Sequence, residues 1–355
     1  MPIRSVGKMS KINLGVIFGG ISTEHEVSMV SGQSVVEHLD SKKYNIYPIY
    51  IDKTGKWYEY KAITGVSEEV DISVRMYNRL EIKNIVNYLK ELDIVFPVLH
   101  GQYGEDGSIQ GMLKMLQIPY VGCNILASSI AMDKVYTKTI LDRAEINQAK
   151  YCYIRKCGNC YKYVENNFET DENELEKICK KIVEKLGLPV FIKPSNYGSS
   201  IGITKAKTEE ELQTGIQEAG KYDNKILVEE YIKGKEIECA VLGNEEVIAS
   251  CTGEIIPAED FYTYDAKYKK QESKLIVPSG IECESQIQEI AKKAFKAIDG
   301  KGLARIDFFV TDKNQIYLNE INTMPGFTNI SMYPKLWENT GISYTELLNK
   351  IIQLA

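Results

Sequence analysis

The sequence predicts an α/β protein whose first part is a parallel, doubly wound sheet, and three observations support this prediction. Continuous apolar stretches at 11–18, 46–51 and 94–99 have the composition of buried strands. A helical pattern that ends near Leu39 separates the first two of them. Near the C-terminus, two runs of β-branched and aromatic residues flank 312–315, as in an antiparallel hairpin. Strands that alternate with helices imply a parallel sheet, which binds ligands beyond the carboxyl ends of its strands.

The composition argues against several classes of protein. With 355 residues, the chain is long enough for two or three domains, each with its own core. A net charge of −6 argues against a protein that binds nucleic acid. No apolar run approaches membrane-spanning length and the N-terminus has no signal-peptide pattern, so we expect a cytoplasmic protein without a membrane partner. Residues 1–10 lack periodicity, and we expect them to be a disordered extension.

Two polar segments follow predicted strands, at the sheet edge where ligands bind. The segment 20–24 follows the first strand, and His100 opens the segment 100–107, which contains three glycines. This density of glycine lets the backbone come close to a ligand. The alternatives are that Glu24 pairs with the N-terminal dipole of the following helix, and that His100 is a hydrogen-bonded histidine at a strand end.

The middle of the chain has one segment without period and one clear helix. The stretch 151–170 is aromatic and rich in cysteine, and we predict irregular structure there. An amphipathic pattern predicts a helix over 172–186. Cys157 and Cys160 have the spacing of a metal or redox pair, but no second Cys or His pair follows at zinc-finger distance. We therefore interpret them as free thiols in a surface turn.

Two further segments carry groups suited to a nucleotide. Lys193 ends a short apolar strand, and the Gly/Ser-rich loop 195–202 offers backbone N–H groups and hydroxyls to phosphate oxygens. The loop lacks the Walker A pattern, and a flexible connector is the alternative. Between two later strands, Glu229 and Glu236 bracket Ile232. This combination suits an adenine edge and a ribose, although a surface hairpin explains it equally well.

The C-terminal hairpin carries a candidate metal site. A turn centred between Lys313 and Asn314 places Asp307 opposite Glu320 and Arg305 opposite Asn322, and all four side chains then share one face. Two opposed carboxylates repel each other unless a cation lies between them. Oxygen donors with few carboxylates suit Mg²⁺ shared with nucleotide phosphates better than Ca²⁺ or zinc. The alternative is a solvated face of an edge hairpin.

Motifs spread over nearly the whole chain resemble the ATP-grasp superfamily and, within it, the D-alanine:D-alanine ligase family. They lie at 19–28, 99–107, 132–134, 193–202, 229–230, 264–268, 305–307 and 319–328. They occur in the family's order, and this makes the resemblance specific. It implies an ATP-grasp fold with an N-terminal substrate-binding domain at 11–133 and two α+β domains that enclose the nucleotide. These are a central domain at 134–228 and a catalytic domain at 229–355, with a mobile loop at about 255–278.

The resemblance also implies which residues bind ATP and metal. Two Mg²⁺ ions, with Mn²⁺ able to substitute, would be held by Asp307, Glu320 and Asn322. The residues implied in ATP binding are Lys134 and Lys193 at the phosphates, Gly198 and Ser200 in the closing loop, and Glu229, Glu230, Ile232 and Glu236 at the adenine and ribose. The metal ligands agree with those expected from the hairpin register.

The amino-acid substrates would contact the remaining motifs. For the first D-alanine, the resemblance implies that Glu24 binds the ammonium and forms a triad with Ser199 and Tyr268, and that His100 lies by the carboxylate. Arg305 and the N–H of Gly326 would form the oxyanion site. For the second D-alanine, Ser331 and Lys267 would hold the carboxylate and Met332 would shape the pocket. The apolar Met332 resembles the D-alanine enzymes.

The activity implied is ATP-dependent ligation of two D-alanines through an acyl phosphate, for peptidoglycan synthesis. A D-Ala–D-Ser ligase is the alternative, and Met332 argues against it because a D-serine pocket should offer a partner to the hydroxyl. A regulatory module on a degenerate fold would have lost the metal or oxyanion positions, which are all present here. The family resemblance also implies a homodimer.

Overall fold

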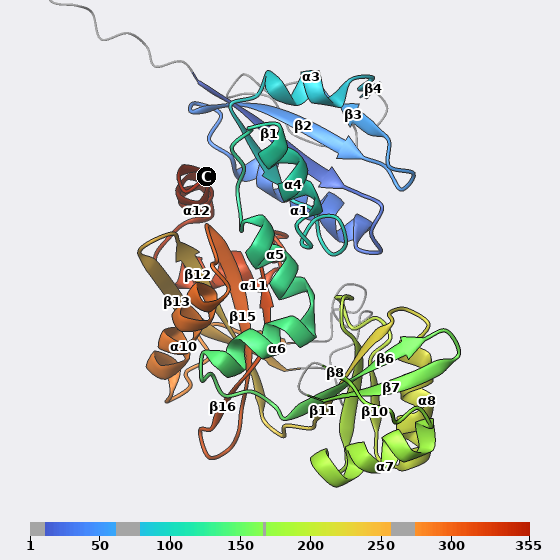
Figure 1. Ribbon diagram of the computed structural model, residues 1–355. Coiled ribbons are helices and arrows are strands. Elements are labelled where there is room, and N and C mark those ends of the chain that lie inside the picture. Colours follow the sequence, from blue (N-terminus) through green and yellow to red (C-terminus); the bar gives the residue numbers. More distant parts are fainter. Residues whose placement is uncertain (1–10, 62–78, 166–167, 257–273) are drawn as a thin grey trace, which may run out of the picture.

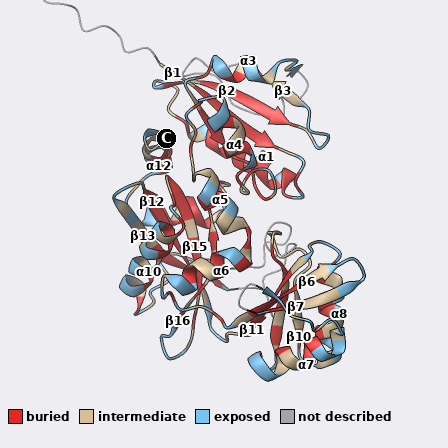
Figure 2. Cartoon of the chain, in the orientation of Figure 1, coloured by how far each residue is buried: buried red, intermediate tan, exposed pale blue. Residues whose placement is uncertain are grey.

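The computed structural model describes residues 11–61, 79–165, 168–256 and 274–355, which form three sheets with helices packed against them (Figure 1). The sheets follow one another along the chain, and each contains its own group of buried apolar residues. Figure 2 shows this burial concentrated in the strands and in the inner faces of the helices. The chain therefore has several cores, as its length led us to expect.

The N-terminal sheet is parallel at its centre. Its strands are β1 (Ile12–Gly19), β2 (Tyr44–Ile51), β3 (Trp57–Glu59), β4 (Leu80–Glu81) and β5 (Ile94–Pro97), and its helices are α1 (His25–His38), α3 (Ile85–Lys90) and α4 (Ser108–Met115). Strand β1 pairs in parallel with both β2 and β5, and this confirms the predicted parallel core. Strands β3 and β4 add an antiparallel edge that we did not predict, because they are too short to show a period.

The second sheet has six strands and two covering helices. After α5 (Ile125–Met132) and α6 (Lys134–Arg143), its elements are β6 (Tyr151–Cys157), β7 (Cys160–Glu165), β8 (Phe168–Glu169), α7 (Leu175–Leu186), β9 (Val190–Pro194), β10 (Thr204–Ala206), α8 (Glu209–Ala219) and β11 (Lys225–Glu230). The buried faces of α7 and α8 share one apolar cluster with the strands. On the other face of the sheet, Val135 of α6 packs against Tyr153, Val164 and Leu227.

The segment 151–170 is not irregular, and that prediction was wrong. Strands β6 and β7 form a hairpin in which Cys157 pairs with Cys160 across a two-residue turn. Gly158 has φ 62° at the first turn position, the conformation that a tight hairpin turn needs there. The turn itself was predicted, but the strands on either side of it were not. Both thiols are free and exposed, which confirms their interpretation as a surface turn.

The third sheet is antiparallel and has a helix on each face. Its elements are β12 (Lys235–Gly243), β13 (Val247–Ile256), β14 (Lys274–Ile276), α10 (Glu284–Ala297), β15 (Leu303–Val310), β16 (Ile316–Asn322), α11 (Met332–Asn339) and α12 (Tyr344–Gln353). Strand β11 pairs with β6 and β9, whereas β12 pairs with β13 and β15. The segment from Glu229 to Glu236 is therefore a crossing between two sheets, and this excludes the surface hairpin.

The C-terminal hairpin has the predicted register at the residues that matter. Asp307 pairs with Glu320, and Arg305 pairs with Asn322. Near the turn, however, Val310 pairs with Ile316, one residue short of the predicted partner. A bulge on β16 supplies the missing residue, so that the predicted pairs form beyond it.

Phe327 anchors the segment after β16 to the N-terminal sheet. Its ring is fully buried, 5.6 Å from the ring of Phe96 and 5.5 Å from that of Tyr333. Its backbone N–H donates to Ser31 Oγ at 3.2 Å. Phe327, which directly follows Gly326, thus lies where apolar residues of the first and third sheets pack into one cluster.

We expect Phe327→Ala to lower the free energy of unfolding by about 3–5 kcal/mol, because it leaves a cavity between Phe96 and Tyr333. Urea denaturation followed by tryptophan fluorescence measures the change. Leu126→Ala is the matched control, since Leu126 is 56% exposed and should cost less than about 0.5 kcal/mol. Equal losses for the two variants would contradict the role assigned to Phe327.

Candidate active site

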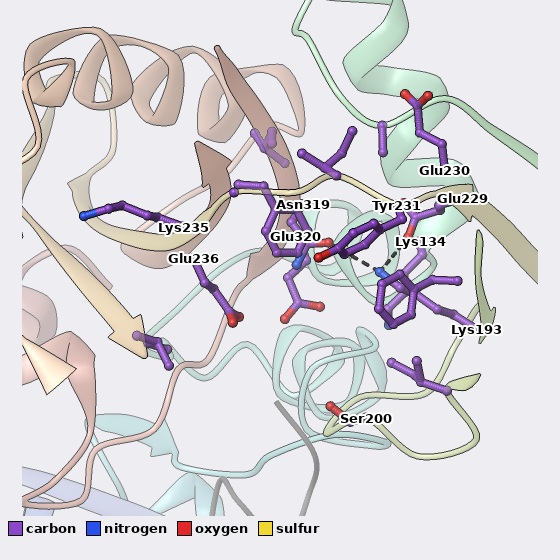
Figure 3. A pocket seen from close by; sticks show the side chains of 18 of the residues that line it. Lys134, Lys193, Ser200, Glu229, Glu230, Tyr231, Lys235, Glu236, Asn319 and Glu320 are labelled. Carbon is purple, nitrogen blue, oxygen red and sulfur yellow. Dashed lines mark hydrogen bonds and ion pairs between the residues drawn. The ribbon is translucent and has the colours of Figure 1, made fainter. Parts of the chain in front are cut away.

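A cavity of about 330 Å³ lies between the second and third sheets (Figure 3). Strands β9 and β11 and the loop 197–200 line one side, and β13, β15 and β16 line the other. The crossing 231–236 closes the space between them. Its volume is in the range of small-molecule sites, and its walls are mainly apolar with a few converging charges.

All eight residues predicted to bind ATP line this cavity. They are Lys134, Lys193, Gly198, Ser200, Glu229, Glu230, Ile232 and Glu236, and Ser199 and Glu320 from the predicted triad and metal site line it as well. Apolar groups that the sequence analysis missed include Phe191, Phe309 and Leu318. Phe191 is on β9, whereas Phe309 and Leu318 are on the distant hairpin of β15 and β16, so no local pattern could have brought the three together. Their flat and aliphatic surfaces suit an aromatic ring.

Glu229 is buried between two lysines at the base of this cavity. Its Oε1 is 2.6 Å from Lys138 Nζ and its Oε2 is 2.5 Å from Lys193 Nζ (Figure 3 shows the second contact). Burial by itself would raise the pKa of Glu229, but the positive charges of Lys138 and Lys193 lower it to about 2. Lys193 Nζ also lies 3.4 Å from Asn319 Oδ1 on β16. Lys193, the predicted phosphate lysine, is therefore in contact with both walls.

The predicted phosphate loop has a constrained backbone. Ser199 and Ser200 have φ values of 52° and 60°, in the left-handed region that non-glycine residues rarely adopt. Lys134 Nζ donates to the carbonyl of Tyr197 at 2.7 Å, and Asn196 donates to the carboxylate of Asp223 from its backbone at 2.8 Å. Strain of this kind persists where the surroundings hold it, and it is frequent at ligand sites.

Arg305 lies beside the predicted metal ligands. Its guanidinium donates to both carboxylate oxygens of Asp307 at 2.7 Å, and its Nε is 3.1 Å from Glu238 Oε2. Burial would lower the pKa of Arg305, but the charges of Asp307 and Glu238 raise it well above its usual value. Glu238 was missed by the sequence analysis. It faces Asp307 across the β12–β15 pair, a register that only the assembled sheet defines.

The donors on this face fit Mg²⁺. Asn322 Nδ2 donates to Asp307 Oδ2 at 3.0 Å, and Glu320 lines the cavity next to them. In the described ranges, no group of three or more His, Cys, Asp and Glu side chains is gathered as a metal site. The donor types, two carboxylates and one amide oxygen, suit a cation that completes its shell with phosphate oxygens and water. Asp307, Glu320 and Asn322 remain predicted ligands.

The N-terminal sheet brings two predicted residues to the same region. His100 is buried, with Nδ1 3.0 Å from the carbonyl of Met324 and Nε2 2.9 Å from Ser31 Oγ. Burial would lower its pKa, but Glu105, 3.7 Å away, raises the pKa of His100 above its ordinary value. Met324 precedes Gly326 by two residues, so His100 contacts the segment of the predicted oxyanion site.

Glu24 lies between the glycine-rich segment and the phosphate loop. A Cβ added to Gly101 or to Gly198 would lie 3.0 Å from Glu24 Oε1. This places Glu24 next to the loop that carries Ser199, as a triad between them requires. Tyr268, the predicted third member, and Lys267 lie outside the described residues.

Ser331 and Met332 differ in how they face the site. A Cβ on Gly326 would lie 2.7 Å from Ser331 Oγ, so this hydroxyl is next to the predicted oxyanion donor. Met332 is 4% exposed, and a Cβ on Gly253 would lie 2.6 Å from its sulfur. Its side chain thus packs in the core against β13. Any influence of Met332 on a substrate would act through that packing.

Two α/β units enclose a cavity lined by lysines and carboxylates, and solved structures similar to this one place the fold in the ATP-grasp class of ligases. The sequence matches the family described as D-ala D-ala ligase N-terminus over residues 13–123 and D-ala D-ala ligase C-terminus over residues 140–353. The chain belongs to the D-alanine–D-alanine ligase family.

Individual relatives agree with this assignment. The D-alanine–D-alanine ligase of Clostridium acetobutylicum is 47% identical over 97% of this chain and 98% of its own length. Among solved structures, the D-alanine–D-alanine ligase from Coxiella burnetii is 35% identical with a TM-score of 0.79, covering 97% of this chain and 95% of its own. The VanG D-Ala:D-Ser ligase from Enterococcus faecalis is 36% identical with a TM-score of 0.83, covering 97% and 99%.

We expect Glu105→Gln to lower the pKa of His100, because the amide keeps an acceptor for the Gly101 N–H but removes the negative charge. The chain has only three histidines, so NMR titration of their ring protons can measure the change. The interaction that raises the pKa of His100 stabilises the fold fully below about pH 6.5. This contribution is lost as the pH rises through the pKa of His100 in the folded protein. The stability gap between wild type and Glu105→Gln should shrink over the same rise in pH.

The matched control for this titration is Glu91→Gln, which removes an exposed carboxylate from the same domain. It should leave the His100 titration unchanged. A pKa of His100 that is the same in Glu105→Gln and wild type would show that Glu105 does not control this ring.

Proposed function

We propose that this protein joins two D-alanines into D-alanyl-D-alanine at the cost of ATP, through an acyl phosphate. The observation that carries the proposal is its near-complete alignment, at 47% identity, with the D-alanine–D-alanine ligase of Clostridium acetobutylicum. A fold alone would not carry it, since one fold can host many reactions. The cavity adds support, because lysines suited to phosphates line it together with oxygen donors suited to Mg²⁺.

The first step makes an acyl donor from a carboxylate. The carboxylate of the first D-alanine attacks the γ-phosphorus of ATP, and ADP leaves. We assign Lys134 and Lys193 to the phosphates, and Asp307, Glu320 and Asn322 to two Mg²⁺ ions. When bound, these ions would neutralise the charge on the transferring phosphoryl group. Glu24 would hold the ammonium of the first D-alanine.

The second step forms the peptide bond. The amine of the second D-alanine attacks the acyl carbon, a tetrahedral oxyanion forms, and phosphate leaves as it collapses. We assign Arg305 and the N–H of Gly326 to the oxyanion, where loss of one donor typically costs about 10²–10³ in rate. The contacts of Arg305 with Asp307 and Glu238 support this role, because they fix its guanidinium in advance. His100 would lie by the first carboxylate, and Ser331 with Lys267 would hold the second.

The proposed setting is peptidoglycan precursor synthesis in the cytoplasm by a homodimer. D-Alanyl-D-alanine is a cell-wall building block, and its two substrates are small molecules. In the parts of the chain that the structure describes, every helix is too short or too polar to cross a bilayer. Size-exclusion chromatography with light scattering would test the dimer.

A D-Ala–D-Ser ligase is the second candidate, favoured by the likeness to the VanG enzyme. The test is mass spectrometry of products after incubation with Mg²⁺-ATP and equal amounts of D-alanine, D-serine and D-lactate. We expect D-Ala–D-Ala to predominate, with ADP and phosphate. Predominant D-Ala–D-Ser would support the second candidate, and the absence of any dipeptide would reject both.

We expect Glu320→Gln to reduce kcat by at least about 10²-fold without unfolding the protein, because it removes one of two carboxylates from the metal face. Turnover should be measured over a range of Mg²⁺ concentrations, with the fold checked by circular dichroism. Glu346→Gln is the control, since it removes a carboxylate from an exposed ion pair on α12. Normal turnover and normal Mg²⁺ dependence in Glu320→Gln would refute the metal assignment.

A further inference from the structure

We propose that Lys138 positions the nucleotide site by holding Glu229, so that Lys193 keeps a positive charge available to the phosphates of ATP. The inference rests on the proposed use of ATP by this cavity. Lys138 is on α6, outside every motif that suggested the function, and it does not line the cavity. Its effect on a ligand would therefore be indirect.

Lys138 is enclosed by acceptors. Its side chain is 3% exposed, and its Nζ lies 2.6 Å from Glu229 Oε1, 3.3 Å from the carbonyl of Ala149 and 3.5 Å from Gln148 Oε1. An ammonium group has three hydrogens to donate, and three acceptors surround it here. A buried lysine with all of its donors matched to protein acceptors has a fixed position and cannot reach into solvent.

The net charge of Glu229, Lys138 and Lys193 determines how this cluster attracts a phosphate. Glu229 accepts from Lys138 through one oxygen and from Lys193 through the other. Two ammonium groups and one carboxylate leave one net positive charge at the cavity wall. If an uncharged side chain replaced Lys138, the charges of Glu229 and Lys193 would cancel, and little attraction for an anionic phosphate would remain.

Helix α6 joins this cluster to the phosphate loop. Lys134 lies four residues before Lys138, so both side chains are on the same side of the helix. Lys134 Nζ donates to the carbonyl of Tyr197, whereas Lys138 binds Glu229. Helix α6 thus contacts the predicted phosphate loop through Lys134, and it contacts Lys193 indirectly, through Lys138 and Glu229.

The test is calorimetric binding of Mg²⁺-ATP to the full-length protein. We expect Lys138→Met to weaken ATP binding by about 10- to 100-fold, the usual effect of losing a hydrogen bond to a charged group. Lys138→Arg should recover part of the affinity because it restores the charge. Arg143→Met is the matched control: it removes an exposed positive charge from the same helix and should bind ATP as wild type does.

A double-mutant cycle separates positioning from a general structural effect. If Lys138 acts by countering the charge of Glu229, then Lys138→Met should change ATP affinity much less in a Glu229→Gln background than in wild type. Equal losses in both backgrounds, or no loss at all, would overturn the inference. Lys138→Gln replaces Lys138→Met if circular dichroism shows that the methionine variant does not fold.

The outcome is independent of the proposed ligation. Wild-type protein that binds ATP but forms no dipeptide would overturn the proposed function and leave the role of Lys138 to be decided by the binding cycle. Wild-type dipeptide synthesis together with unchanged ATP affinity in Lys138→Met would overturn the role of Lys138 alone.

Discussion

The carboxylate of Glu229 is buried between Lys138 and Lys193. The cavity between the second and third sheets is organised around these three charged groups. Each partner comes from a different element, α6, β9 or β11. A buried charge without a partner is very unfavourable, so the three elements must meet in this arrangement whenever the protein is folded. Lys193 then extends the contact to Asn319 on the third sheet. One buried carboxylate and its two lysines thus link elements of both walls of the cavity.

The chemistry is divided among parts of the chain that fold separately. The second sheet supplies Lys193, proposed to hold the phosphates, and the third supplies Arg305 and the predicted metal ligands. The N-terminal domain supplies Glu24 and His100, proposed to hold the first D-alanine. Packing at Phe327 holds the first and third sheets together. The contact of Glu24 with Gly198 brings the first sheet to the phosphate loop. The proposed reaction of ATP with two D-alanines could use such a division, because different sheets would present groups to different reactants.

Prediction succeeded where a residue's role depends on local spacing. Alternation along two strands and a turn between them were sufficient to place Asp307 opposite Glu320, and the bulge in β16 corrected an error of one residue in the turn. Apolar strands alternating with helices were sufficient for the parallel sheet. The hairpin of Cys157 and Cys160 was missed, because a short polar turn between aromatic strands has a weak periodic signal. Glu238 and Lys138 were missed because their partners are distant in sequence.

The sequence by itself determined the kinds of group available and their local order: lysine and glycine before a phosphate loop, carboxylates at fixed spacing on a hairpin, and motifs in the order of a known family. Only the tertiary structure decided how these groups share charge. In the folded chain, Glu229 pairs with two lysines, Asp307 pairs with Arg305, and Met332 is buried in the core. The physical reason is that ion pairing and burial depend on distances between strands and helices. Those distances arise only when the sheets pack together.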